Sequence, residues 1–398
     1  MSLLQPKTLK PMSTSEAIAY AVKQANVDVI AAYPITPQTI IVERLSEYVN
    51  NGELDAEYIA VESEHSAMSA CVAASLTGAR VFTSTASQGL ALMHEVLYIA
   101  SSLRCPIVMA IANRALSAPI NIHCDHSDMM GSRDAGWIQI FVENGQQAYD
   151  RIFQAFKLAE DEDILLPVGV NLDGFFLSHA VEGIATISDS EAAMFLPPRK
   201  AKYYIDSSMS MTFGAFALPD WYFEIKHQVV EAMEKVPKKL AEIEEIYYKM
   251  TGRRYGHVGA YKTDDAEVCL ICAGSAAATA KFAVTSLREK GIKAGLLSIR
   301  LFRPFPAESI LPHIKDVKAL VVMDRAMSPG APSAPIGQDI KTVLYDAGLN
   351  IPVANYVYGL GGRDISVAEF ENIITKIIED LKAGRPIERG VRYWGLRI

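Results

Sequence analysis

The chain has 398 residues, half of them apolar, and 38 basic against 46 acidic residues give it a net charge of −8. This composition allows sizeable hydrophobic cores and more than one domain, and it argues against a nucleic-acid surface as the main function. No stretch approaches the roughly 18 uninterrupted apolar residues of a membrane span, and the first residues lack an apolar signal region. We therefore expect a cytoplasmic protein without membrane contacts.

The first part of the chain alternates apolar, β-rich runs with helical ones. We expect strands at residues 27–33, 56–62, 79–86, 106–113 and 164–172, and helices at 37–50, 65–77, 90–103 and 146–160. Such alternation is typical of an open parallel sheet that helices cover on both faces. The fold class is therefore α/β.

Two prolines enclose the turn after the first strand. The stretch AYPITPQT places Pro34 and Pro37 on either side of Ile35 and Thr36. Proline fixes φ and biases the residue before it away from helix, so the chain must turn here. The pattern predicts a helix that begins at Pro37, with Thr36 as its N-cap. A further role for Thr36 stays open at this point.

Polar residues follow the next three strands. They are Glu64 within SEH, then Ser87, Gln88 and Gly89, and then Arg114 after an asparagine. In an open parallel sheet, ligands bind at the carboxyl ends of the strands, and helix N-termini there favour anions. Each group also has a purely structural interpretation, such as a helix-dipole contact for Glu64. Together, however, these groups predict a binding site.

The remaining chain contains a break in the alternation and a second α/β unit. Residues 181–260 include one long charged helix, and strand and helix patterns resume near Asp265 and end with a helix near 367–382. The five cysteines are scattered. Cys269 and Cys272 lie in an apolar strand, which presents them to opposite faces.

A cluster of possible metal ligands follows Arg114. It consists of His123, Asp125, His126 and Asp128. Their spacing fits no closed zinc pattern, and loop structure or substrate contacts explain them better. We predict no metal site in this chain.

The sequence contains four motifs in this order: YPITP, VESEHSA, TASQGLALMHE, and NRALSAP with the downstream DHSD. Together they resemble the α subunit of the pyruvate:ferredoxin oxidoreductases, within the 2-oxoacid:ferredoxin oxidoreductase family. LFRPFP and GLGGRD resemble that family's transketolase C-terminal-like domain. The resemblance implies an open parallel-sheet thiamine-diphosphate pyrimidine-binding domain at residues 1–195. A connecting segment with the long helix follows at 196–262, and a transketolase C-terminal-like α/β domain occupies 263–398.

The resemblance also implies an activity. In this family pyruvate is oxidatively decarboxylated with coenzyme A to acetyl-CoA and CO₂, and the electrons pass to ferredoxin. Glu64 matches the glutamate that hydrogen-bonds the cofactor's pyrimidine and drives its imino tautomer; Glu62 is the alternative. Arg114 and Thr36 match residues that bind the substrate. The implied cofactor contacts are Glu64, Pro34, Ile35, Ser87, Gln88 and Gly89.

The resemblance further implies partner subunits. The sequence contains no G-D-G motif for the diphosphate, so we expect a beta subunit to hold the diphosphate and Mg²⁺. Gamma and delta subunits, which are ferredoxin-like, would carry [4Fe-4S] clusters. Three alternatives stay open: another 2-oxoacid, such as 2-oxoisovalerate, 2-oxoglutarate or an arylpyruvate; a dehydrogenase component that passes its acyl group to a lipoyl domain; and a non-catalytic assembly subunit.

Overall fold

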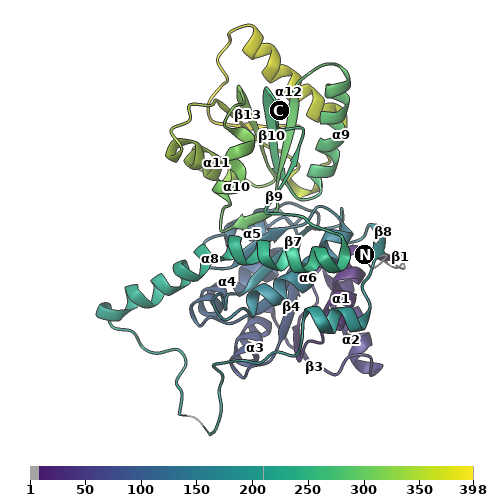
Figure 1. The fold of residues 1–398 in the computed structure, drawn as a ribbon, viewed down its shortest axis with the longest axis vertical. Helices are drawn as coiled ribbons and strands as arrows, with labels where there is room; N and C mark the ends of the chain where they lie inside the picture. Colours follow the sequence, from purple (N-terminus) through teal and green to yellow (C-terminus); the bar gives the residue numbers. More distant parts are fainter. Residues whose placement is uncertain (1–8, 209, 398) are drawn as a thin grey trace.

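The computed structural model describes residues 9–208 and 210–397, which build two α/β units, one above the other in Figure 1. The lower unit contains a seven-stranded sheet in the order β12-β6-β7-β5-β4-β2-β3. Its strands are β2 (Val29–Ala32), β3 (Glu57–Ala60), β4 (Val81–Thr85), β5 (Ile107–Asn113), β6 (Ile138–Phe141), β7 (Val168–Asp173) and β12 (Leu301–Arg303). All neighbours pair in parallel except β12 with β6. The predicted parallel sheet is confirmed.

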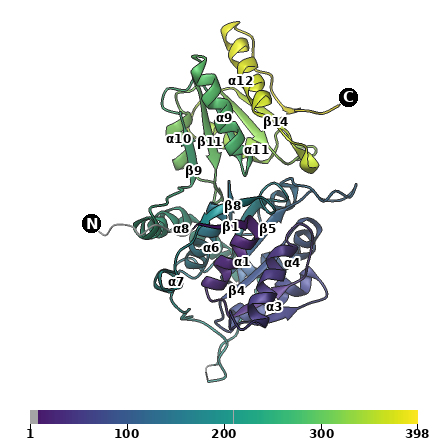
Figure 2. The same cartoon turned by 90° about the vertical axis from the view of Figure 1, so that its right-hand side faces the viewer.

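Helices cover both faces of this sheet, as the alternation predicted (Figure 2). One core contains side chains of α1 (Thr14–Gln24), α2 (Thr39–Asn50), α6 (Gly145–Ala159) and the long α8 (Pro219–Thr251). The other core contains side chains of α3 (Glu64–Leu76) and α4 (Ser87–Ser102). Smaller elements complete the unit: α5 (Ser127–Gly131), α7 (Asp189–Phe195) and a two-stranded sheet of β1 (Leu9–Ser13) and β8 (Val181–Ala185).

The turn before α2 differs from its predicted form. The helix begins at Thr39, and its N-cap residue is Gln38, which makes no side-chain capping bond, so the prediction of Thr36 as N-cap was wrong. The buried amide of Gln38 holds the turn instead. Its Nε2 donates to the Tyr33 carbonyl at 2.8 Å, and its Oε1 accepts from Ser84 Oγ at 3.0 Å. The Thr36 hydroxyl is thereby released from any capping role.

The upper unit contains a six-stranded sheet in the order β15-β14-β13-β10-β11-β9. Its strands are β9 (Val258–Tyr261), β10 (Val268–Ala273), β11 (Ala294–Ile299), β13 (Ala319–Asp324), β14 (Val353–Val357) and β15 (Val391–Tyr393). Its helices are α9 (Ala276–Glu289), α10 (Ala307–Ile314), α11 (Pro335–Asp346), the short η1 (Leu360–Gly362) and α12 (Val367–Lys382). Cys269 and Cys272 are buried in the cores on opposite faces of this sheet.

The two units share strands across the predicted boundaries. β9 comes from the segment expected to be a connection, yet it pairs with β11 of the upper sheet. β12 follows β11 in the chain, yet it joins β6 in the lower sheet. The division after residues 195 and 262 therefore stays a prediction. No helix within the described ranges has the length and apolar character needed to cross a membrane.

Candidate functional site

The carboxyl ends of strands from both sheets meet between the two units. Asp173 ends β7 in the lower sheet, Ser275 follows β10, and Arg325 follows β13 in the upper sheet. Ser275 Oγ donates to Asp173 Oδ2 at 2.5 Å, and Arg325 Nη1 donates to the same oxygen at 2.9 Å. The edge of the lower sheet where ligands were predicted thus faces the corresponding edge of the upper sheet.

Glu64 lies at this edge as the first residue of α3, where Ser63 caps the helix by accepting from the Ser66 amide at 3.3 Å. Glu64 is 6% exposed, and its carboxylate makes no hydrogen bond or ion pair with the described part of the chain. Thr85 Oγ1, nearby, is buried and has no protein partner among the described residues either. Buried polar groups are normally hydrogen-bonded, so this pair indicates a place for a polar ligand.

Gly89 explains how the carboxylate fits. A Cβ built on Gly89 would lie 2.6 Å from Glu64 Oε1 and 2.5 Å from Thr85 Oγ1. Neither distance leaves room for a methyl group. The backbone of α4 can therefore approach Glu64 only because residue 89 is glycine. Glu64, Thr85 and Gly89 thus form a cradle in which a buried carboxylate and a hydroxyl are free to hydrogen-bond a polar ligand.

Replacing Gly89 with alanine is expected to lower the activity of the assembled enzyme about 10²-fold, because the added methyl displaces the Glu64 carboxylate. The measurement is steady-state turnover with saturating thiamine diphosphate. Gly131→Ala is the matched control, since a Cβ at that position meets nothing within 4 Å. Equal activity of the two variants would show that the close approach at Gly89 is unimportant.

The Asp128 carboxylate accepts hydrogen bonds from residues at the ends of both β4 and β5. Its Oδ2 accepts from the Ser87 amide at 3.0 Å and from the Arg114 amide at 2.9 Å, while its Oδ1 accepts from Asn113 Nδ2 at 2.9 Å. Ser87 has a φ of 49°, in the left-handed region, so it needs such support. Burial raises the pKa of Asp128, and these hydrogen bonds oppose that rise. The sequence suggested loop structure or substrate contacts for the DHSD residues and gave no sign of this role for Asp128.

Arg114 and Thr36 lie beside each other. Arg114 Nη1 donates to the Thr36 carbonyl at 2.9 Å, and its Nε donates to the Asn121 carbonyl at 3.1 Å. Burial lowers the pKa of Arg114, and Asp128 opposes this effect. Within the described residues, neither Arg114 Nη2 nor the Thr36 hydroxyl has a hydrogen-bond partner. Two polar groups, one after β2 and one after β5, are thus left for a ligand.

Ser87, the first residue of α4, contacts the loop that follows β5 and contains Arg114. Its Oγ lies 2.5 Å from the Ala115 carbonyl and 2.5 Å from Gln88 Oε1. The start of α4 is therefore linked by direct contacts to the loop that follows β5. Pro34 is exposed and Ile35 is half-buried in the neighbouring turn.

Glu62, the alternative carboxylate, has a different environment. It is exposed, and its Oε1 hydrogen-bonds Ser66 Oγ and lies 3.4 Å from Ser63 Oγ. The Ser66 hydrogen bond lowers the pKa of this carboxyl. Since Glu62 is already paired and faces water, the geometry favours Glu64.

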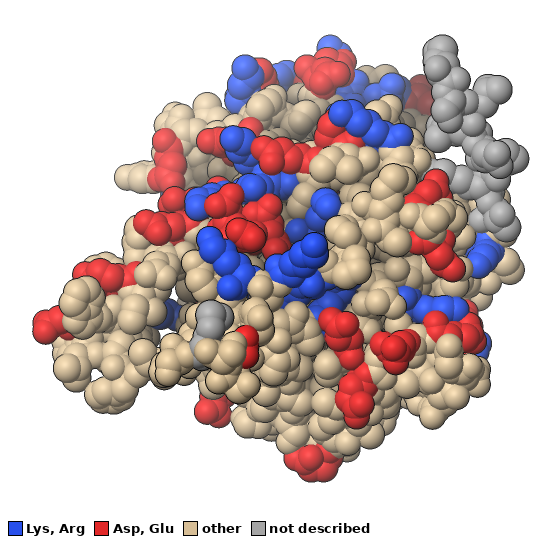
Figure 3. Space-filling view, turned by 60° about the horizontal axis from the view of Figure 1, so that its bottom comes forward, with Lys and Arg blue, Asp and Glu red and all other residues tan. Residues whose placement is uncertain are grey.

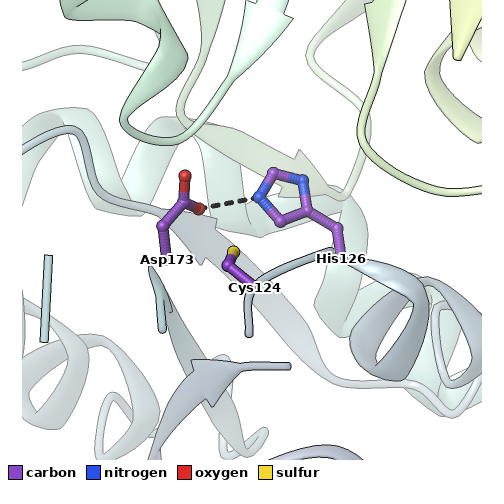
Figure 4. A group of neighbouring side chains, drawn as sticks. All are labelled: Cys124, His126 and Asp173. Carbon is purple, nitrogen blue, oxygen red and sulfur yellow. Dashed lines mark hydrogen bonds and ion pairs between the residues drawn. The ribbon is translucent and has the colours of Figure 1, made fainter. Parts of the chain in front are cut away.

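The side chains of Cys124, His126 and Asp173 form a buried group between the units (Figure 4). Their possible ligand atoms lie within 4.8 Å of one another, but His126 Nε2 already binds Asp173 Oδ1 at 2.8 Å. Burial alone raises the pKa of Asp173, yet His126 and Arg325 hold it well below its usual range. Burial raises the pKa of the Cys124 thiol well above its usual value. The group is thus a hydrogen-bonded network in which the Arg325 guanidinium balances the charge of the Asp173 carboxylate.

The GLGGRD segment of the upper unit, residues 359–364, hydrogen-bonds the loop that follows Arg114. Asn121 Nδ2 donates to the Gly361 carbonyl at 3.0 Å, and the Gly362 amide donates to the Cys124 carbonyl at 2.7 Å. Asp125 Oδ2 accepts from the Gly361 amide at 3.3 Å. Because the Asn121 carbonyl also accepts from Arg114, the upper unit helps to position Arg114.

Comparison with known proteins identifies the family of the chain. Residues 20–245 match the family "Pyruvate flavodoxin/ferredoxin oxidoreductase, thiamine diP-bdg", and residues 266–370 match "Pyruvate:ferredoxin oxidoreductase core domain II". The chain belongs to the pyruvate:ferredoxin oxidoreductase family. It is 49% identical to pyruvate synthase subunit PorA of Methanocaldococcus jannaschii, over 93% of this chain and 95% of the relative. The subunit PorA of Thermotoga maritima is also 49% identical, over 96% and 97%.

A solved structure supports the family fold. The 2-oxoglutarate:ferredoxin oxidoreductase of Magnetococcus marinus, determined with 2-oxoglutarate, coenzyme A and succinyl-CoA bound, superposes with a TM-score of 0.73 at 18% identity. The match covers 94% of this chain and 66% of that chain. At this identity the likeness concerns the fold, and it confirms the α/β arrangement predicted from the sequence.

Proposed function

We propose that this chain is the α subunit of a pyruvate:ferredoxin oxidoreductase, a multi-subunit enzyme that converts pyruvate and coenzyme A to acetyl-CoA and CO₂ in the cytoplasm. The observation that carries the proposal is the buried Glu64 carboxylate, which has no partner among residues 9–208 and 210–397 and fits beside α4 because residue 89 is glycine. A family match over both units and relatives named pyruvate synthase support it.

The residues of this chain have separate roles in the proposal. Thiamine diphosphate, when bound, supplies a nucleophilic carbon and an electron sink for decarboxylation of a 2-oxoacid. Glu64 hydrogen-bonds the pyrimidine ring of the cofactor and promotes proton movement at its amino group. Gly89 and Ser87 fix the backbone beside that ring. Arg114 Nη2 and the Thr36 hydroxyl bind the carboxylate and keto oxygens of the substrate.

Replacing Arg114 with alanine is expected to raise the KM for pyruvate about 10- to 150-fold, since a charge-assisted hydrogen bond contributes about 1.5–3 kcal/mol. The kcat should fall less, because Glu64 is untouched. The control is Arg44→Ala, which removes an exposed arginine paired with Glu16 and Glu47. An unchanged KM for Arg114→Ala would remove Arg114 from the substrate site.

The proposal assigns the rest of the chemistry to partners. A beta subunit would hold the diphosphate and Mg²⁺, because this sequence has no G-D-G motif. Gamma and delta subunits would carry the [4Fe-4S] clusters that pass electrons to ferredoxin. The subunit names of the relatives support a multi-subunit assembly.

The test is reduction of a low-potential dye by the complex purified through this chain, with coenzyme A and one 2-oxoacid at a time. Strong preference for pyruvate over 2-oxoisovalerate and 2-oxoglutarate is the expected result. Preference for a bulkier acid would keep the mechanism and overturn the substrate. Absence of activity with all three would overturn the proposed function.

A further inference from the structure

An apolar arm projects from the lower unit. We define the arm as residues 210–225, which lead into and include the first two turns of α8. Figure 1 shows it standing away from the body at the left, and in Figure 3 the protruding end on that side carries mostly uncharged side chains. Its sequence from Phe216 to Phe223, FALPDWYF, concentrates four aromatic residues in eight positions.

These aromatic side chains face solvent. Phe216 is 92% exposed, Phe223 76%, Trp221 67% and Tyr222 58%. With about 150–250 Å² available on each such side chain, they expose on the order of 600 Å² of largely apolar surface. A stable interface takes about 800 Å² from each partner, so the arm alone supplies most of one. Patches of this size on a folded protein mark interaction sites.

The arm helix has almost no support from its own chain. The first buried residue of α8 is Val229, and the described residues of the arm itself include no buried side chain. At its base, Lys226 Nζ donates to Ser102 Oγ at the end of α4 at 2.7 Å. Helices in proteins draw most of their stability from packing an apolar face, and here that face is open.

The outer face of α4 leads from the cofactor cradle to this arm. Leu92 and Ile99 are exposed on one face of α4, Tyr98 is exposed beside Ile99, and the charged side chain of Glu95 lies between them, on the stretch from Gly89 to Ser102. The chain that completes the cofactor must reach Glu64, because this chain has no diphosphate motif of its own. A partner placed over Glu64 and extended along this exposed face of α4, which we call the α4 stripe, would reach the base of the arm, where Lys226 contacts Ser102.

We propose that the arm and the α4 stripe form one docking surface for the subunit that carries the diphosphate site, with the arm acting as a clamp that reaches beyond the cofactor. This inference rests on the proposed function, because the occupant is identified by its cofactor half. In this arrangement, much of the free energy of subunit association comes from contacts far from the reacting groups. Aromatic side chains typically contribute most of that free energy at an interface.

The test replaces Phe216, Trp221 and Phe223 together with serine in the full chain. We expect the affinity for the separately purified subunit that contains the G-D-G motif, measured by calorimetry, to fall at least 30-fold. The control is the double change Phe282→Ser and Tyr345→Ser, which removes exposed aromatic residues from the upper unit and should leave the affinity unchanged. Circular dichroism and thermal unfolding confirm that both variants fold.

A photo-crosslinking residue in place of Phe216 gives a second measurement in the assembled complex. Crosslinks to the G-D-G subunit are expected. Crosslinks only to a second copy of this chain, or unchanged affinity of the triple variant, would overturn the docking proposal. Failure of the proposed function has a different signature, since wild-type complex would then show no 2-oxoacid-dependent dye reduction.

Discussion

Replacing Glu64 with glutamine is expected to lower 2-oxoacid-dependent dye reduction by about 10²- to 10⁴-fold, the range that a positioned acid–base group contributes. Glutamine keeps the shape of the side chain in the cradle beside Gly89 but cannot share a proton with the cofactor ring. Because the change is nearly isosteric, binding of thiamine diphosphate to the complex should weaken much less than turnover. The measurement is kcat in the assembled enzyme with saturating cofactor.

Glu62→Gln is the matched control for this experiment. Glu62 is two residues away, exposed and already hydrogen-bonded to Ser66, so its replacement should leave kcat within about twofold. Near-normal turnover of Glu64→Gln together with a large loss in Glu62→Gln would reverse the assignment of the two carboxylates.

Replacing Arg325 with alanine is expected to lower the free energy of unfolding by about 3–5 kcal/mol at neutral pH, because it leaves a buried carboxylate without its guanidinium partner. Asp173 is fully buried, and Arg325 Nη1 lies 2.9 Å from its Oδ2. The measurement is equilibrium unfolding in denaturant. The control is Arg385→Ala, since Arg385 forms an exposed pair with Asp380 and should contribute about 1 kcal/mol or less.

The effect of Arg325→Ala on the free energy of unfolding should depend on pH in a defined direction. The pKa of Asp173 is lowered in the folded protein, so its ion pairs stabilise the fold above the usual carboxyl pKa and lose this effect as the pH falls. In Arg325→Ala that pKa should rise, and protonation then relieves the buried charge. The stability difference between the two proteins should therefore shrink in acid. A difference that stays constant from pH 7 to pH 4 would contradict the ion-pair explanation.

The sequence predicted the lower sheet well because its strands are apolar runs of four to seven residues separated by helical patterns. It missed β6, whose run IQIF is only four residues long and contains a polar glutamine. It also missed β12, a three-residue strand that no local pattern distinguishes from the loop around it.

The sequence could indicate candidate residues where polar side chains follow a strand, as Glu64 and Arg114 do. It could not indicate the supporting residues, because their partners lie far away in the chain. Asp128 was visible as a carboxylate in DHSD, but its hydrogen bonds to two strand ends required the fold. Arg325 and Asp173 are 152 residues apart, and no local spacing relates them. Gln38 displaced the expected role of Thr36 because a buried amide can satisfy the turn from two sides.

The short strand β12 affects how the two units unfold. It lies between β11 and α10 of the upper unit, yet it pairs with β6 in the lower sheet, so the upper unit cannot be removed without opening an edge of the lower one. Loss of either sheet exposes backbone groups and apolar surface of the other. Heating should therefore melt the two units as a single cooperative block, and a gene divided between them would yield halves that depend on each other to fold.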